Sequence, residues 1–454
     1  MGVGCGATWT ETSERDVEAG QAGTASNEAR HQGGSGMAAG VFTVLRNRNA
    51  RIYLGGVIIS GFGDSAMLLA SGVWVKELTG SNSLAALVTF CAWAPVLAGP
   101  FIGTLADRMR RRTLLIATSL ALAVVMTVPV AVRSPEDVWL LFTVLTLVGT
   151  GTVLMDAAET ALIASAVPSE LRGDFNGLAR TAVESTALLG PLIGAGLFTV
   201  LGGPTVALLN ALSFLLAAAA FSLIRAREPA PAARKRQSWT AASSDGIRYL
   251  WRHPTLRPLV VAGGCAMAAS GLSSTATFAL LDIGLGQAAA FAGVLSSIQG
   301  LGSVVGGLAA GALLRRVPAR ALSAIGLAVF AVGVLARLSG SVPVVSAGSL
   351  LIGLGLPWPL ISALTTVQKE TPDELLGRVA ATANTLVFAP TGLALLVGTA
   401  MVATFDHRVQ LLAAGTLGLA TAVLLAIAGR TRRGTGPAGP GAAHRPCEAA
   451  PADK

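Results

Sequence analysis

The amino-acid sequence predicts an all-α polytopic membrane protein, with twelve transmembrane helices arranged as two pseudo-symmetric six-helix bundles. Of its 454 residues, 52% are hydrophobic and only 13% are charged, and the mean hydropathy is +0.65. Soluble domains carry about 25% charged residues, so roughly half of the usual charge is absent. The apolar residues gather in about twelve runs of about 20 residues, the length that a helix needs to cross a bilayer.

The spans are predicted where long apolar runs lie between polar loops. They cover residues 52–74, 84–106, 113–132, 138–164, 175–201, 206–224, 259–281, 289–314, 321–338, 344–367, 379–403 and 409–428. The tenth contains the stretch Gly-Leu-Gly-Leu-Pro-Trp-Pro at 353–359. Proline removes a backbone hydrogen bond and clashes with the preceding turn, so this helix is predicted to kink or break there.

Changes in composition divide the chain into five parts. Residues 1–40 are rich in small and acidic residues and are predicted to be disordered, and Met37 is an alternative to Met1 as the start of translation. The predicted parts are a tail at 1–40, an N-terminal six-helix half at 41–225, a cytoplasmic linker at 226–257, a C-terminal six-helix half at 258–430 and a disordered tail at 431–454. Within the linker, Ile247, Leu250 and Trp251 predict either a short helix on the membrane surface or a partly ordered connection.

The loop charges predict the orientation of the chain. Placing both termini in the cytoplasm leaves only Lys76, Arg133 and Arg408 on the outer side, which satisfies the positive-inside rule. The net charge of +9 lies in short loops between apolar runs, which argues against nucleic-acid binding. We expect a multi-pass monomer in the lipid bilayer of the cell membrane, plasma or inner.

The sequence gives no support for a metal, a cofactor or an enzyme. The four cysteines have no CxxC partner, so they predict neither a metal site nor a disulfide framework. The four histidines lie in tails or loops without the companions that a catalytic set needs.

The loop after the second run places four arginines in the five positions 108–112 and follows Gly103 and Asp107. Gly103, Asp107, Arg108 and Arg111 or Arg112 resemble the signature loop between helices 2 and 3 of the major facilitator superfamily. The Thr-Gly-Ser loop at 79–81, the Pro-x-Glu-Leu turn at 168–171 and Gly-Pro at 190–191 resemble its branch of bacterial multidrug, macrolide and siderophore exporters. The resemblance implies proton antiport, by alternating access, that exports an amphipathic small molecule such as a drug or natural product. An importer or lipid flippase of the same fold and a transport-inactive membrane sensor remain alternatives.

A repeat relates the two halves. The turn at 168–174 matches that at 372–378, an offset of 204 residues. The family architecture implies that helix 2 faces helix 11 and helix 5 faces helix 8, so Asp107 would meet Arg378, and Arg315 or Arg316 would meet Asp174. These charges are either a cytoplasmic gate or solvated loop charge. The proposed gate comprises Gly103, Asp107, Arg108, Arg112, Asp174, Arg315, Arg316 and Arg378.

Ionisable residues inside the spans concentrate in the N-terminal half. Asp64 lies near the middle of the first span, Asp156 and Glu159 lie on the fourth, and Arg180 and Glu184 lie on the fifth. Residues three or four apart share a helix face, so each pair projects together. Charge within a bilayer is costly and marks functional groups, which predicts proton or substrate coupling. Structural packing of the same carboxylates is the alternative.

The matching C-terminal positions predict a mostly apolar wall for the substrate. We place Gln299, Trp358, Asn384 and Phe388 on it. Trp93, Trp358 and Phe388 either stack on a planar ligand or pack between helices, which is the commoner role of aromatic residues at such places. In the fifth span, Gly190, Pro191 and Gly194 predict close packing and a helix that can flex.

Overall fold

The computed structural model describes residues 42–99, 102, 109–166, 171–224 and 239–430. Within these residues the chain is helical and contains no strand, which confirms the all-α class. The predicted tails at 1–40 and 431–454 lie outside the described residues, as do Gly103, Asp107 and Arg108 of the signature loop.

The N-terminal half contains six long helices, with two short 3-10 turns between the third and the fourth. The helices are α2 (Arg48–Thr79), α3 (Asn82–Leu97), α5 (Arg111–Val125), α6 (Val138–Ala166), α7 (Arg172–Leu201) and α8 (Gly203–Leu223). The turns are η1 (Val128–Ala131) and η2 (Pro135–Asp137). Ser134 and Asp137 form a capping box at η2, in which the side chain of each residue accepts a hydrogen bond from the backbone N–H of the other.

The C-terminal half repeats this layout. Its elements are α10 (Leu256–Thr275), α11 (Thr277–Ala279), the π-turn η4 (Leu280–Gly284), α12 (Phe291–Arg316), α13 (Ala319–Ala336), α14 (Val342–Gly355), α15 (Pro357–Glu370), α16 (Asp373–Thr404) and α17 (His407–Arg430). The predicted break in the tenth span is confirmed, because α14 ends at Gly355 and α15 begins at Pro357.

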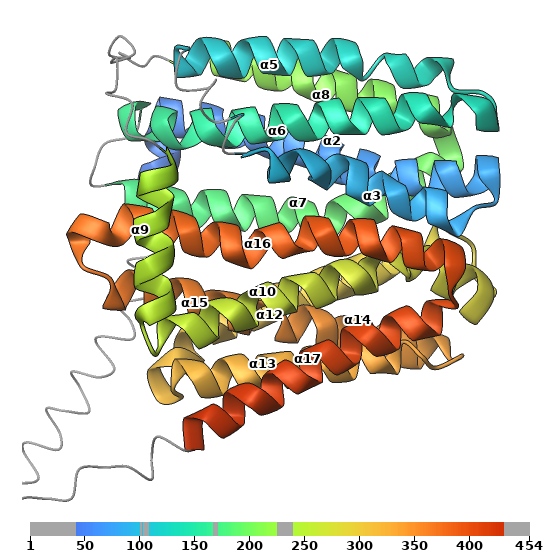
Figure 1. The fold of residues 1–454 in the computed structure, drawn as a ribbon. Coiled ribbons are helices and arrows are strands. Elements are labelled where there is room, and N and C mark those ends of the chain that lie inside the picture. Colours follow the sequence, from blue (N-terminus) through green and yellow to red (C-terminus); the bar gives the residue numbers. More distant parts are fainter. Residues whose placement is uncertain (1–41, 100–101, 103–108, 167–170, 225–238, 431–454) are drawn as a thin grey trace, which may run out of the picture.

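The described helices are long and apolar enough for a membrane. Eleven segments meet that condition by length and composition, and α3 is a shorter apolar helix. Together they confirm the predicted twelve-helix layout. Figure 1 shows the two halves side by side, with the blue-to-green helices of one next to the yellow-to-red helices of the other.

The halves meet along two helix pairs. Helix α3 packs against α16, and α7 packs against α12. These are the second and eleventh spans and the fifth and eighth spans, so the expected pairing is confirmed. In Figure 1, α7 and α16 run through the middle of the molecule, between the outer helices of each half.

Helix α9 (Trp239–Arg252) connects the halves and crosses the ends of the long helices at a steep angle (Figure 1). It packs on α16 and α10 of the C-terminal half. Leu250 is buried in one apolar cluster with Leu256 and Val379, whereas Ile247 and Trp251 are exposed. The helix therefore packs Leu250 against the protein and exposes the apolar side chains of Ile247 and Trp251 on its surface.

The backbones of the C-terminal half approach one another very closely at α14. A Cβ atom on Gly353 would lie 2.9 Å from the backbone nitrogen of Ser303 on α12, and one on Gly355 would lie 2.6 Å from the backbone nitrogen of Phe330 on α13. Real Cβ atoms do not approach this closely, so only glycine fits. Helix α14 is thereby held directly against the backbones of two neighbours.

Candidate functional site

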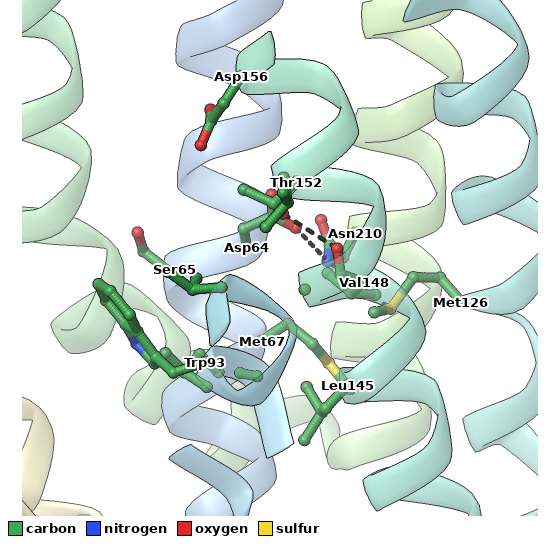
Figure 2. Close-up of a pocket in the computed structure, with 15 residues that line it drawn as sticks. Asp64, Ser65, Met67, Trp93, Met126, Leu145, Val148, Thr152, Asp156 and Asn210 are labelled. Atoms are coloured by element: carbon green, nitrogen blue, oxygen red, sulfur yellow. Dashed lines mark hydrogen bonds between the residues drawn. The ribbon is translucent and has the colours of Figure 1, made fainter. Parts of the chain in front are cut away.

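A cavity of about 270 Å³ lies inside the N-terminal half, among α2, α3, α6 and α8. Its wall is largely apolar, with Met67, Trp93 and Val148 among its members (Figure 2). Two carboxylates, those of Asp64 and Asp156, also line it. The cavity therefore combines the greasy surface that suits an amphipathic ligand with acids able to carry protons.

Asp64 is held in place by a chain of polar side chains. Its carboxylate accepts a hydrogen bond of 3.2 Å from Nδ2 of Asn210 on α8. Asn210 is only 1% exposed, and its Oδ1 accepts a 2.9 Å bond from the Ser213 hydroxyl. Figure 2 shows Asp64 and Asn210 facing each other beside the cavity. A buried amide thus fixes the orientation of an acid that borders an open space.

A second acidic group lies along α6. Asp156 and Glu159 are one turn apart, and they interact electrostatically with each other. Tyr53 of α2 donates its hydroxyl hydrogen bond to Glu159. Tyr53 is itself buried, with its ring 5.5 Å from that of Phe175. The structure brings the two predicted acids together and adds Tyr53, whereas the side chain of Arg180 lies outside the described residues.

Two glycines of α7 bring that helix against α2 next to Asp64. A Cβ atom on Gly190 would collide with Cβ of Ser65, and one on Gly194 would lie 2.6 Å from Cα of Ala66. Pro191 sits inside α7, which continues through it to Leu201. Gly190 and Gly194 therefore form the contact at which α7 packs on the helix that carries Asp64, whereas Pro191 lies beside Gly293 of α12.

A second cavity of about 470 Å³ lies between the two halves. It shares Ser65, Leu68 and Trp93 with the first cavity, so the two adjoin. From the predicted set it contains Glu184 of α7 and Gln299 of α12, together with Pro191. The second cavity therefore lies at the interface of the two six-helix repeats.

Sequence reasoning missed Arg337, which also lines the second cavity. It follows the last residue of α13 and is only 3% exposed. Its guanidinium donates to Gln299 Oε1 at 3.2 Å and to the Ser349 hydroxyl at 3.1 Å. In the sequence, an arginine at the end of an apolar run is typical of a loop. Its burial depends on the packing of α10, α12 and α14 around the end of α13, which the sequence does not show.

Three other residues predicted for the substrate wall do not line either of these two cavities. Trp358 donates from Nε1 to the Gly306 carbonyl at 2.9 Å, within the C-terminal half. Phe388 packs against the apolar cluster around Leu250, and Asn384 is exposed. None of the three is among the residues that line these two cavities.

The predicted gate residues are described only in part. Arg112 donates to the carbonyls of Phe221 and Ser222, where it caps the C-terminal end of α8 within the N-terminal half. Arg315 and Arg316 form the last turn of α12, and Arg378 lies near the start of α16. Asp107 and the side chain of Asp174 lie outside the described residues, so both predicted ion pairs do too.

The opposite end of the bundle carries a polar contact between the halves that the sequence did not suggest. Lys76 at the end of α2 donates to Asp282 of η4 at 2.6 Å, and Asn82 donates to the same carboxylate at 3.1 Å. Nearby, the Ser83 hydroxyl donates to the Thr399 carbonyl at 3.1 Å. These bonds join the first half to the second at the end away from α9.

The hydrogen bond from Lys76 and then that from Asn82 lower the pKa of Asp282 below its ordinary value. A lowered pKa means that the contact is present above the usual range of an aspartate and is lost only as the pH falls through the lowered value. The pair is exposed enough that each bond contributes at most about 1 kcal/mol. We therefore expect the closure of this end to be insensitive to pH near neutrality.

Reversing the charge of Lys76 should open this end. In a variant without its four cysteines, spin labels at Glu77 and Gln287 should report a longer distance for Lys76→Asp, because two carboxylates then face each other. The double variant Lys76→Asp, Asp282→Lys should restore the short distance. Arg133→Asp, an exposed arginine at the same end, serves as the control. An unchanged distance distribution in Lys76→Asp would show that the bond does not hold this end closed.

Among the described residues, no group of three or more histidine, cysteine, aspartate or glutamate side chains is placed to hold a metal ion. The chemistry available at the site is therefore carried by carboxylates, amides, hydroxyls and one guanidinium.

Comparison with known proteins relates the chain to drug exporters. It is 31% identical over 207 residues to the multi-drug resistance efflux pump PmrA of Streptococcus pneumoniae serotype 4, which is 44% of this chain and 51% of that protein. The match thus spans about half the length of that relative. The chain is 24% identical over 397 residues to macrolide efflux protein A of Streptococcus pyogenes, which is 83% of this chain and 95% of that protein.

Solved transporter structures share the fold. A peptide transporter crystallised with alafosfalin superposes with a TM-score of 0.65 at 17% identity, covering 85% of this chain and 95% of that one. The nucleoside transporter NupG gives a TM-score of 0.65 at 12% identity, covering 84% and 100%. The sequence model of the Major Facilitator Superfamily matches residues 53–395, which is more than half of the chain, and the chain therefore belongs to that superfamily.

Proposed function

We propose that the protein is a secondary active transporter that exports an amphipathic small molecule by proton antiport with alternating access. The cell membrane is its location, and we place both termini in the cytoplasm on the basis of the loop charges. The observation that supports the proposal best is Asp64, an acid held by a buried amide at the edge of a largely apolar cavity.

The proposal of proton coupling is supported by the other acids that lie near Asp64. An aspartate within a span is expensive when charged, and it can take up a proton to become neutral. Asp156 lines the same cavity, and Glu159 lies one turn away from it. Asp156 and Glu159 interact electrostatically, so a proton taken up by one of them changes how readily the other releases its proton. Competition between proton and substrate for this group of acids would couple the two fluxes.

The substrate class rests on the two adjoining cavities. Their volumes of about 270 and 470 Å³ suit small molecules of drug size. Apolar side chains such as Leu68 and Met67 make up much of the wall, with a few polar groups among them. A ligand with a greasy body and a polar or charged end fits that surface. The similarity to a multidrug pump and a macrolide exporter agrees with this class.

Alternating access rests on the seam between the halves. The contacts of Lys76, Asn82 and Ser83 tie the halves together at the end away from α9. In a rocking motion of two repeats, closure at one end accompanies opening at the other. We therefore propose that the structure represents the conformation in which the outer end is closed, and that the charges predicted for the cytoplasmic gate meet in the opposite conformation.

Accumulation of ethidium and of the macrolide erythromycin in an efflux-deficient bacterial host tests the function. Cells that express the protein should retain less of at least one compound than cells with the empty vector. A protonophore should raise retention to the empty-vector level. The matched control is the triple variant Asp64→Asn, Asp156→Asn, Glu184→Gln, produced at the same level. Higher accumulation than in the control would indicate an importer, and efflux that survives the protonophore would contradict proton antiport.

A further inference from the structure

Arg337 is a buried cation that the proton-coupling scheme does not use. It lies in the C-terminal half, it is 3% exposed, and it closes α13 at the level where α10, α12 and α14 surround it. Moving a guanidinium out of water is costly unless an anion or a full set of hydrogen bonds compensates it.

The partners of Arg337 are all uncharged. The guanidinium donates to the hydroxyls of Ser273 at 3.4 Å and Ser349 at 3.1 Å and to the amide oxygen of Gln299 at 3.2 Å. Its Nε is buried and has no hydrogen-bond partner. Within the described residues, no carboxylate lies within ion-pair distance of it. An arginine offers five N–H donors, so both its charge and part of its donor capacity are left over.

The uncompensated positive charge of Arg337 lies at the wall of the second cavity. Arg337, Ser273 and Gln299 all line that cavity, and Ser270 and Ser274 of α10 line it too. Leu69, Phe278 and Ile352 supply an apolar surface to the same space. A planar guanidinium without an anionic partner, beside hydroxyls and an apolar wall, is suited to a carboxylate, phosphonate or sulfonate on an apolar body.

We propose that Arg337 binds the anionic group of an amphipathic organic substrate in the second cavity. This inference rests on the proposed function, because it names a class of compound that the transporter carries. It also fixes the direction in which that compound lies. Glu184 lines the N-terminal side of the same cavity, and Asp64 and Asp156 line the adjoining one. When ionised, these acids repel an anion, so the charged end points to the C-terminal half and the apolar body toward the N-terminal half.

Binding of a charged and a neutral form of one compound tests this assignment. The purified full-length protein, reconstituted in phosphatidylcholine nanodiscs, is titrated calorimetrically with 1-naphthoate and with 1-naphthamide. The two probes share an aromatic body and differ in the anionic group. The wild-type protein should bind naphthoate more tightly than naphthamide. Arg337→Gln should lower the affinity for naphthoate by about tenfold or more, the order expected for lost charge-assisted hydrogen bonds, and leave that for naphthamide unchanged.

Two further variants separate binding from structure. Arg337→Lys keeps the positive charge and should keep part of the preference for naphthoate. Arg408→Gln removes an exposed arginine near the same end of the C-terminal half and should bind both probes as the wild type does. Thermal unfolding gives the second readout, because an arginine retained for a ligand should be replaceable by glutamine without a lower Tm. A structural arginine would instead lower the Tm when replaced.

Three results would overturn the assignment. They are equal affinity of the wild type for the two probes, no binding of either, and naphthoate binding that survives Arg337→Gln. The titration needs no proton gradient and no vectorial transport. It can therefore fail while protonophore-sensitive export stands, and it can succeed in a protein that proves not to export, so the two proposals fail separately.

Discussion

Replacing Asp64 by asparagine should abolish proton-coupled export and leave the fold intact. Asparagine has nearly the same shape and can still accept the hydrogen bond from Asn210, but it cannot bind or release a proton. Retention of the exported dye should rise to the level of cells without the protein. Release of protons when substrate is added to purified protein, followed with a pH-sensitive dye, should be lost as well.

The comparison for this variant is Glu136→Gln. Glu136 is an exposed acid in η2, so its neutralisation removes the same charge far from the cavity. It should export and release protons as the wild type does. Proton release that persists in Asp64→Asn would move the coupling to other groups, and the triple variant would then show whether Asp156 and Glu184 carry it.

Replacing Gly194 by alanine should disrupt the helix contact next to Asp64. The added methyl group would lie 2.6 Å from Cα of Ala66 and even closer to its carbonyl oxygen, and backbone atoms cannot move aside as a flexible side chain can. Overpacking of this kind costs about 1–3 kcal/mol. We expect a lower Tm of the purified protein and loss of export, because α7 must move away from the helix that carries the acid.

The same helix supplies the matched substitution. A Cβ atom on Gly196 would meet nothing within 4 Å, although Gly196 lies only two residues from Gly194. Gly196→Ala should therefore retain export and raise the Tm slightly, since alanine favours a helix over glycine by about 1 kcal/mol. Equal Tm values for the two variants would mean that α2 and α7 are not in contact at Gly194.

Features that depend on local sequence were predictable. Apolar runs gave the spans, and the Gly-Leu-Gly-Leu-Pro-Trp-Pro stretch predicted the break between α14 and α15, because proline acts on its own helix. Asp64 was identified as a candidate because a charge inside an apolar run is unusual wherever the helix packs. The pairing of α3 with α16 and of α7 with α12 came from the family resemblance and not from the runs themselves.

Features that depend on helix rotation and on distant contacts were not predictable. The offset of 204 residues matched Asn384 to Arg180 and Phe388 to Glu184, but neither Asn384 nor Phe388 lines the two cavities, and Phe388 packs against the apolar cluster that contains Leu250. A repeat offset fixes depth along a helix and leaves open which way each side chain points. The bond from Lys76 to Asp282 joins residues 206 positions apart, and no local pattern marks such a pair.

The direct backbone contacts of α14 bear on how specificity can evolve. At Gly353 and Gly355 any side chain would strike the main chain of α12 or α13, so these positions admit almost no variation. The walls of the two cavities are built from side chains such as Trp93, Leu68 and Gln299, which have no such restriction. Laboratory selection for new drug resistance should therefore accumulate mutations along the cavity walls. It should leave Gly353 and Gly355 unchanged, because they allow α14 to pack directly on α12 and α13.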